Sequence, residues 1–359
     1  MRRRQLLASV ALSGVAGCGY AAGPGDELER FQVGDELPGI GNIRAMADER
    51  IILAYREHHP TALPSLEHEP RLGVYDWTGE PIAMLSLDAP IVDLAVAERI
   101  AIQTEAGLLV SVPVDRLTSE DWTAWSTSLA EDATPVGTRG AGVVVRSGDT
   151  IQMLVDASVV WTATFDGPIG STVVTADRVV ASGGGTVSAF DHEGRSVWSK
   201  SVTGANLSGH GKQIMIHTPR SLMFVDDGEL VWDRRASSIE PSPRLAGTLV
   251  LVSERTGGRR EGRLVGIDRS TGDERFVLED PSGTGGPVAA TQNGVVLVDD
   301  DCTVWGIQHE TVTWRRSLDR DRCRARAVRR AADHVAVLFG DGAITRYQHV
   351  AAQPRGWAP

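Results

Sequence analysis

The feature that most constrains the fold is a short phrase that recurs along the chain. It contains an acidic turn, a glycine and, about four positions later, an aromatic residue that opens a short apolar run. The clearest copies are Asp191-His-Glu-Gly194-Arg-Ser-Val-Trp198, Asp226-Asp-Gly228-Glu-Leu-Val-Trp232 and Asp268-Arg-Ser-Thr-Gly272-Asp-Glu-Arg-Phe276. Looser copies end at Trp125, Trp161 and Trp314, and a cruder copy leads from Asp76-Trp-Thr-Gly79 to Met84.

The spacing of these copies indicates the architecture. Successive anchor positions are separated by 41, 36, 37, 34, 44 and 38 residues. This is the period of a four-stranded propeller blade, and it is too irregular for a helical repeat. Each repeat divides into four short runs rich in Val, Ile and Thr, clearest at 171–175, 178–182, 186–190 and 196–201. Such runs, separated by Gly and Asp, are typical of short antiparallel strands.

Counting repeats predicts an all-β fold, an eight-bladed propeller of four-stranded antiparallel blades. The first seven blades end near Leu87, Ala130, Asp166, Val202, Arg235, Glu279 and Leu318, and the eighth starts at Cys323. Seven blades remain the alternative if blade one, which an insertion stretches, is irregular. The run 28–33 carries Phe31 at the anchor position, so we expect it to pair with blade eight and close the ring. Trp357 competes for the same position.

The aromatic anchors have a structural interpretation. A large ring that opens each outer strand can bury on the order of 150–250 Å² between adjacent blades. Their fixed place in the repeat favours this role over a solvent-facing surface that stacks on sugars or bases. The predicted structural anchors are Trp125, Trp161, Trp198, Trp232, Phe276 and Trp314.

The first eighteen residues predict export and a lipid anchor. A basic head is followed by an apolar stretch from Leu6 to Val15, which is too short to span a membrane and fits a signal peptide. Arg3 and Arg4 precede two leucines after one spacer, as in a twin-arginine export signal. Val15-Ala16-Gly17-Cys18 resembles the lipobox of prokaryotic lipoproteins, whose cysteine carries the lipid. The alternative is an ordinary secreted protein that is cleaved nearby.

These features divide the chain into a signal peptide at 1–17, a lipid-bearing Cys18 that opens a flexible tether at 18–27, and one propeller domain at 28–359. The predicted location is extracytoplasmic, with the protein anchored to the membrane by the lipid.

The formal net charge of −11 disfavours nucleic acid as a partner. Nearly all positive charge is arginine, as in high-GC or salt-adapted prokaryotes, and the basic cluster 316–330 fits a solvated turn.

Candidate chemistry is sparse. Cys302 and Cys323 could form a disulfide between blades seven and eight, because an exported protein meets an oxidising compartment. The 56–70 insertion holds three histidines, but its prolines and irregular spacing favour an exposed loop over zinc. Asp299-Asp300-Asp301 lacks the order of a calcium loop. The sequence therefore predicts no catalytic residue, no metal site and no cofactor. The histidines of the insertion are His58, His59 and His68.

The phrases that end at Trp198 and Phe276 resemble the repeat of the pyrroloquinoline quinone (PQQ)-like propellers. That family includes quinoprotein dehydrogenases and non-enzymatic members such as the lipoprotein subunit of the outer-membrane barrel-assembly machinery. The resemblance to the enzymes implies adjacent cysteines and calcium ligands. This chain has no Cys-Cys dipeptide, and its residues align with no calcium ligand set.

We therefore expect a non-enzymatic, lipid-anchored envelope propeller that is a monomer and binds a protein partner. The alternative is a quinoprotein-type dehydrogenase or a sugar-directed enzyme. The longest excursions are 57–70 in blade one, 115–121 in blade two and 256–261 in blade six. Because hairpins alternate between the two faces of a ring, the first and third should share one face. We expect a partner, basic or salt-tolerant, on that face.

Overall fold

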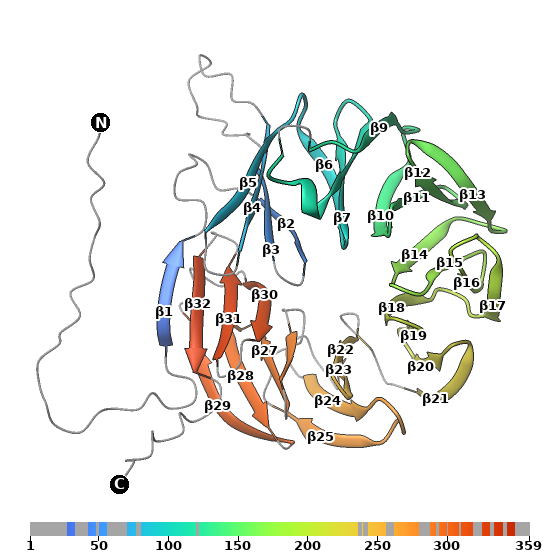
Figure 1. The fold of residues 1–359 in the computed structure, drawn as a ribbon. Coiled ribbons are helices and arrows are strands. Elements are labelled where there is room, and N and C mark those ends of the chain that lie inside the picture. Colours follow the sequence, from blue (N-terminus) through green and yellow to red (C-terminus); the bar gives the residue numbers. More distant parts are fainter. Residues whose placement is uncertain are drawn as a thin grey trace, which may run out of the picture.

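A ring of short antiparallel sheets makes up the fold. The computed structural model describes residues 27–32, 42–47, 50–55, 70–76, 80–119, 122–235, 239, 243–255, 262–279, 288–291, 294–299, 301–308, 310–318, 325–330, 334–339 and 343–348. Strands in these residues form eight four-stranded sheets, which Figure 1 shows arranged around a common centre. The one helical segment among them is the 3-10 turn η1 (Val114–Arg116). The structure confirms the predicted all-β propeller.

Each of blades one to four uses four consecutive strands, paired in chain order. Blade one contains β2 (Asn42–Ala47), β3 (Arg50–Tyr55), β4 (Arg71–Tyr75) and β5 (Pro81–Ser86). Blade two contains β6 (Ile91–Val96), β7 (Arg99–Thr104), β8 (Leu108–Pro113) and β9 (Trp125–Ser128). Blade three contains β10 (Thr134–Arg139), β11 (Gly142–Ser147), β12 (Thr150–Val155) and β13 (Ser158–Thr164). Blade four contains β14 (Ile169–Val174), β15 (Val179–Gly183), β16 (Thr186–Phe190) and β17 (Ser196–Ser201).

Blades five to seven repeat this order, and blade eight takes its fourth strand from the other end of the chain. Blade five contains β18 (Asn206–His210), β19 (Gln213–Thr218), β20 (Ser221–Asp226) and β21 (Glu229–Arg235). Blade six contains β22 (Arg244–Ala246), β23 (Leu249–Arg255), β24 (Gly262–Asp268) and β25 (Glu274–Leu278). Blade seven contains β26 (Val288–Thr291), β27 (Gly294–Val298), β28 (Thr303–Gln308) and β29 (Thr311–Ser317). Blade eight contains β30 (Ala325–Arg330), β31 (His334–Phe339), β32 (Ala343–Gln348) and β1 (Glu27–Gln32).

The N-terminal strand closes the ring. β1 pairs antiparallel with β32, and Phe31 lies opposite Ile344. Figure 1 shows β1 at the outer edge of blade eight, beside the last strands of the chain. The pairing confirms the predicted closure by the run around Phe31, whereas Trp357 lies outside the described residues. Because β1 covers the outer edge of β32, blade eight is a complete four-stranded sheet.

The core lies between the blades. Second and third strands are buried on both faces: all five residues of β15 are buried, as are four consecutive residues of β8. Outer strands such as β13 are mostly exposed. Strands that are covered on both faces read as continuous apolar runs, as Val143-Val144-Val145 does in β11. Each blade therefore buries its middle strands against its two neighbours.

An indole ring links one blade to the next. A Cβ atom added to Gly272 in the blade-six turn would lie 2.7 Å from Cγ of Trp232 in blade five. The Nε1 of Trp232 donates to the carbonyl of Arg269 in the same turn (2.9 Å). Trp161 of blade three has the same relation to Gly194 of blade four, where the Cβ would lie 2.5 Å from Cγ. These glycines have φ of +79° and +76°, so both their backbone angle and the adjacent ring exclude a side chain.

The other anchors vary this contact. Trp198 lies against Gly228 of blade five, whose φ is +92°. Trp314 of blade seven packs on Tyr347 of blade eight, with ring centroids 6.3 Å apart. Four anchors are buried, while Trp161 and Trp198 are half-buried. The buried ones are Trp125, Trp232, Phe276 and Trp314.

Removing β1 should weaken the whole ring. A variant that starts at residue 34 exposes the edge of β32, and we expect its melting temperature to fall by roughly 5–10 °C with aggregation on heating. A control that starts at residue 27 keeps β1 and should melt like the full chain. Thermal unfolding with light scattering measures both effects. Equal melting temperatures and no aggregation would show that closure by β1 contributes little.

Candidate binding faces and cavity

The hairpins divide the loops between two faces of the ring. In blades one to seven the first–second and third–fourth connections lie at one end of the strands, which we call face one. The second–third connections lie at the other end, which we call face two. In blade three, for example, residues 140–141 and 156–157 are on face one and residues 148–149 are on face two.

The long excursions fall on these faces as the topology requires. The connection from β3 to β4 (56–70) and that from β23 to β24 (256–261) both belong to face two. Residues 56–69 and 256–261 are not among those the structure describes. The connection from β8 to β9 belongs to face one, and its Leu117 is 3% exposed in a core cluster with Ile100 and Val112. The described part of this blade-two segment is thus packed onto its blade.

A buried carboxylate stands at the base of the blade-six loop. Glu254, near the end of β23, is 2% exposed, and its Oε2 accepts two hydrogen bonds from Arg263 of β24, at 2.9 and 2.7 Å. Arg234 of blade five lies 3.9 Å from the other oxygen. The hydrogen bonds that Arg263 donates to Glu254 raise the pKa of its guanidinium. This cluster fixes both ends of the 256–261 loop and ties blade six to blade five.

Face one carries a cavity between blades five, six and seven. Its volume is about 810 Å³, within the range of small-molecule sites. Three glycines line it, so no side chain from those positions fills the opening. The lining residues are Gly209, His210, Leu245, Ala246, Gly247, Thr248, Leu249, Arg269, Arg275, Phe276, Gly294, Ile307 and Glu310. Sequence reasoning missed this site, because its residues come from hairpins of three different blades.

An arginine side chain on face one is buried between blades three and four. Arg139, the last residue of β10, is 5% exposed, and its Nη2 lies 2.5 Å from Nε2 of His192 in the blade-four turn. Burial lowers the pKa of this guanidinium, and the carboxylate of Asp177 acts in the opposite direction. Since the guanidinium only donates, His192 accepts through an unprotonated Nε2. Arg139 thereby connects blades three and four.

The acidic residue of the repeat shapes its turn. The carboxylate of Asp268 accepts hydrogen bonds from the backbone N of Ser270 (2.8 Å), from its hydroxyl (2.6 Å) and from the backbone N of Thr271 (3.2 Å). The hydroxyl of Ser270 is the main cause that lowers the pKa of Asp268. In blade four, Asp191 likewise accepts from the backbone N atoms of residues 193 and 195. These aspartates hold the turns on which the anchors pack.

The residues that the sequence singled out for a disulfide, a lipid anchor, export or calcium binding do not come together at one site. Cys302 is 6% exposed and takes part in a disulfide. Cys323 falls in an undescribed segment, so its pairing with Cys302 stays a prediction, and Cys18, Arg3 and Arg4 are likewise undescribed. The Asp299 carboxylate accepts from Thr303 N (2.8 Å) and Trp305 Nε1 (2.7 Å), which gives it a structural role in its turn.

The described part of the chain contains no group of three His, Cys, Asp or Glu side chains that could hold a metal ion. The loop with His58, His59 and His68 lies outside that part. None of the helical structure described is long and apolar enough to cross a membrane.

Comparison with known proteins assigns the class of repeat. Residues 112–221 match the sequence profile of the family described as outer membrane protein assembly factor BamB. These residues resemble the PQQ-like repeats of BamB, and the chain as a whole is a β-propeller. No curated protein sequence matches it.

Solved structures of low sequence identity share the fold. BamB from Moraxella catarrhalis superposes with a TM-score of 0.62 at 15% identity, covering 92% of this chain and 99% of that one. The computationally designed Ika8 protein gives a TM-score of 0.62 at 13% identity, with 92% and 100% covered. Saccharomyces cerevisiae Sqt1 gives 0.59 at 8% identity, with 91% and 100% covered. At these identities the likeness is one of fold.

Replacing the buried carboxylate of Glu254 should lower the free energy of unfolding more than replacing an exposed carboxylate. Glu254→Gln leaves the guanidinium of Arg263 without its anionic partner, and we expect a loss of about 2 kcal/mol in the free energy of unfolding. Glu193→Gln is the control, because Glu193 pairs with Arg195 at the surface, where such pairs contribute below about 1 kcal/mol. Chemical denaturation of both variants measures the difference. Equal losses would show that Glu254 does not organise this part of the ring.

Proposed function

We propose that this protein is a non-enzymatic, lipid-anchored propeller of the cell envelope that binds a protein partner on face two. The observation that carries the proposal is the placement of the two second–third connections, 56–70 and 256–261, on one face of a closed ring. A rigid frame that presents long loops is the usual arrangement for binding. The Glu254 cluster provides such a frame at the base of the blade-six loop.

The leader supports the location that we propose. Cys18 follows Val15-Ala16-Gly17 and would carry the lipid, and Arg3 and Arg4 would direct export. The resemblance to BamB, whose name describes an outer membrane protein assembly factor, supports an envelope role in which the partner is a protein. The acidic net charge favours a partner with a basic surface.

A quinone-dependent enzyme is the alternative, and the residues present do not fit its cofactor. Calcium that holds the quinone needs several oxygen ligands at one place. The carboxylate of Asp299 instead accepts from Thr303 and Trp305 of β28, the strand that follows its turn. The sequence also lacks adjacent cysteines. We therefore derive no catalytic step.

One crosslinking experiment tests the proposal. The tagged full-length chain is crosslinked in intact cells of its source organism, and captured proteins are identified by mass spectrometry. Replacing 57–69 by a short Gly-Ser linker should remove the partner while the variant stays folded in the membrane fraction. Pro70 is kept because its carbonyl accepts from Leu87 N (2.8 Å). Glu229→Lys, an exposed change on face one, is the control and should keep the partner.

Cys18→Ser tests the anchor in the same cells. We expect this variant to leave the membrane fraction, because it has no thiol to carry the lipid. If it stays in the membrane, the proposed anchor is wrong. If the loop variant captures the same proteins as the wild type, face two is not the docking face.

A further inference from the structure

We propose that the cavity between blades five, six and seven binds an organic anion, a carboxylate attached to an apolar body. The cavity opens on face one, opposite the loops that we assign to a protein partner. The proposal therefore does not depend on the proposed function, and each can fail without the other.

The charge that recognises the anion is Arg269. This residue lies in the blade-six turn, half-buried, and its guanidinium has no ion pair with any described residue. Its backbone is held on both sides, because its N donates to the Thr248 carbonyl (2.8 Å) and its carbonyl accepts from Trp232 Nε1 (2.9 Å). Because this backbone is already ordered, binding of a carboxylate to the guanidinium requires ordering of the side chain alone.

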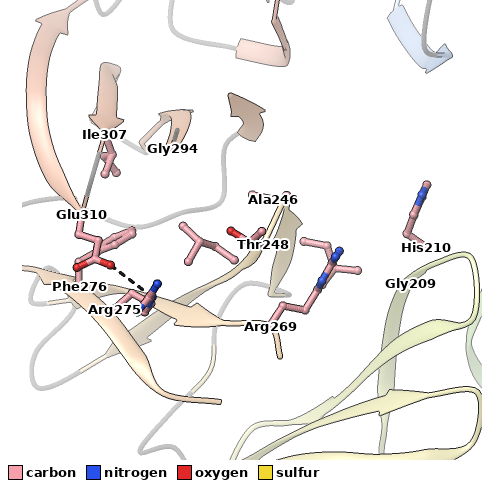
Figure 2. A pocket seen from close by; sticks show the side chains of 13 residues that line it. Gly209, His210, Ala246, Thr248, Arg269, Arg275, Phe276, Gly294, Ile307 and Glu310 are labelled. Atoms are coloured by element: carbon pink, nitrogen blue, oxygen red, sulfur yellow. Dashed lines mark ion pairs between the residues drawn. The ribbon is translucent and has the colours of Figure 1, made fainter. Parts of the chain in front are cut away.

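Other donors stand around Arg269. His210, at the end of β18 in blade five, is exposed and has no side-chain hydrogen bond to the described residues. Thr248 adds a hydroxyl from the β22–β23 turn. Figure 2 shows Arg269 and Thr248 near the middle of the cavity and His210 at one end. These groups place hydrogen-bond donors along this part of the cavity, on a chain whose formal net charge is −11.

The opposite end of the cavity combines buried apolar residues with a charge-balanced ion pair. Phe276 and Ile307 are 7% and 1% exposed and form part of its wall. Arg275 is neutralised, since its Nε lies 3.3 Å from Glu310 and 3.6 Å from Asp268. Figure 2 shows this ion pair beside Phe276. An apolar body directed to this end and a carboxylate at Arg269 match the two halves of the cavity.

The test uses 2-naphthylacetate as the probe and its neutral amide as the matched compound, titrated by calorimetry into the purified full chain. We expect the acid to bind with a submillimolar Kd and the amide about tenfold more weakly. Arg269→Ala should weaken binding of the acid about tenfold and His210→Ala by a smaller factor. Arg220→Ala, an exposed arginine on face two, is the control and should bind like the wild type.

A second titration distinguishes a protein segment from a small molecule as the natural ligand that supplies the carboxylate. A capped pentapeptide with an Asp-Phe pair carries the same chemistry on a polypeptide, and the Asn-Phe version is its control. Tighter binding of the Asp-Phe peptide than of the free acid assigns the site to a protein segment, and the reverse order assigns it to a small molecule. The proposal is overturned if neither probe binds, if acid and amide bind equally, or if a folded Arg269→Ala variant binds the acid as the wild type does.

Discussion

The contact between an indole ring and the turn glycine of the next blade is the interaction on which this structure depends. In three successive joints the ring occupies the space where a Cβ would stand, at Gly194, Gly228 and Gly272. A propeller has no single core, so its stability is the sum of such blade-to-blade interfaces. In the turns of Gly194 and Gly272, an aspartate accepts from backbone N atoms and so holds the backbone in the shape that brings the glycine to the ring.

This contact also determines where the candidate sites are. Because Trp232 donates to the carbonyl of Arg269, the joint between blades five and six fixes the backbone of the residue that we assign to anion binding. On face two, the joint is reinforced by Glu254, which accepts from Arg263 and lies near Arg234 of the preceding blade. The two faces are thus stabilised by the same joint, although different residues form the two sites.

The phrase that ends in tryptophan was sufficient to predict the fold, because one local pattern sets both the turn and the strand that follows. It also predicted the closing strand, since Phe31 stands alone at the anchor position before blade one. The sequence could not predict that Trp161 and Trp198 are only half-buried, because the exposure of each indole depends on the neighbouring blade. The same reason hid the cavity, whose Arg269, His210 and Glu310 come from three blades. Spacing within one repeat contains no information on such juxtapositions.

The most direct test of this account compares two alanine substitutions at glycines of positive φ. Gly272 (φ +79°) lies under Trp232, whereas Gly204 (φ +65°) has no atom within 4 Å of an added Cβ. Chemical denaturation of Gly272→Ala and Gly204→Ala therefore separates the strain of the backbone from the contact with the ring. We predict a loss of about 1 kcal/mol for Gly204→Ala and of about 2–4 kcal/mol for Gly272→Ala. Equal losses would contradict the claim that the indole contact holds the blades together.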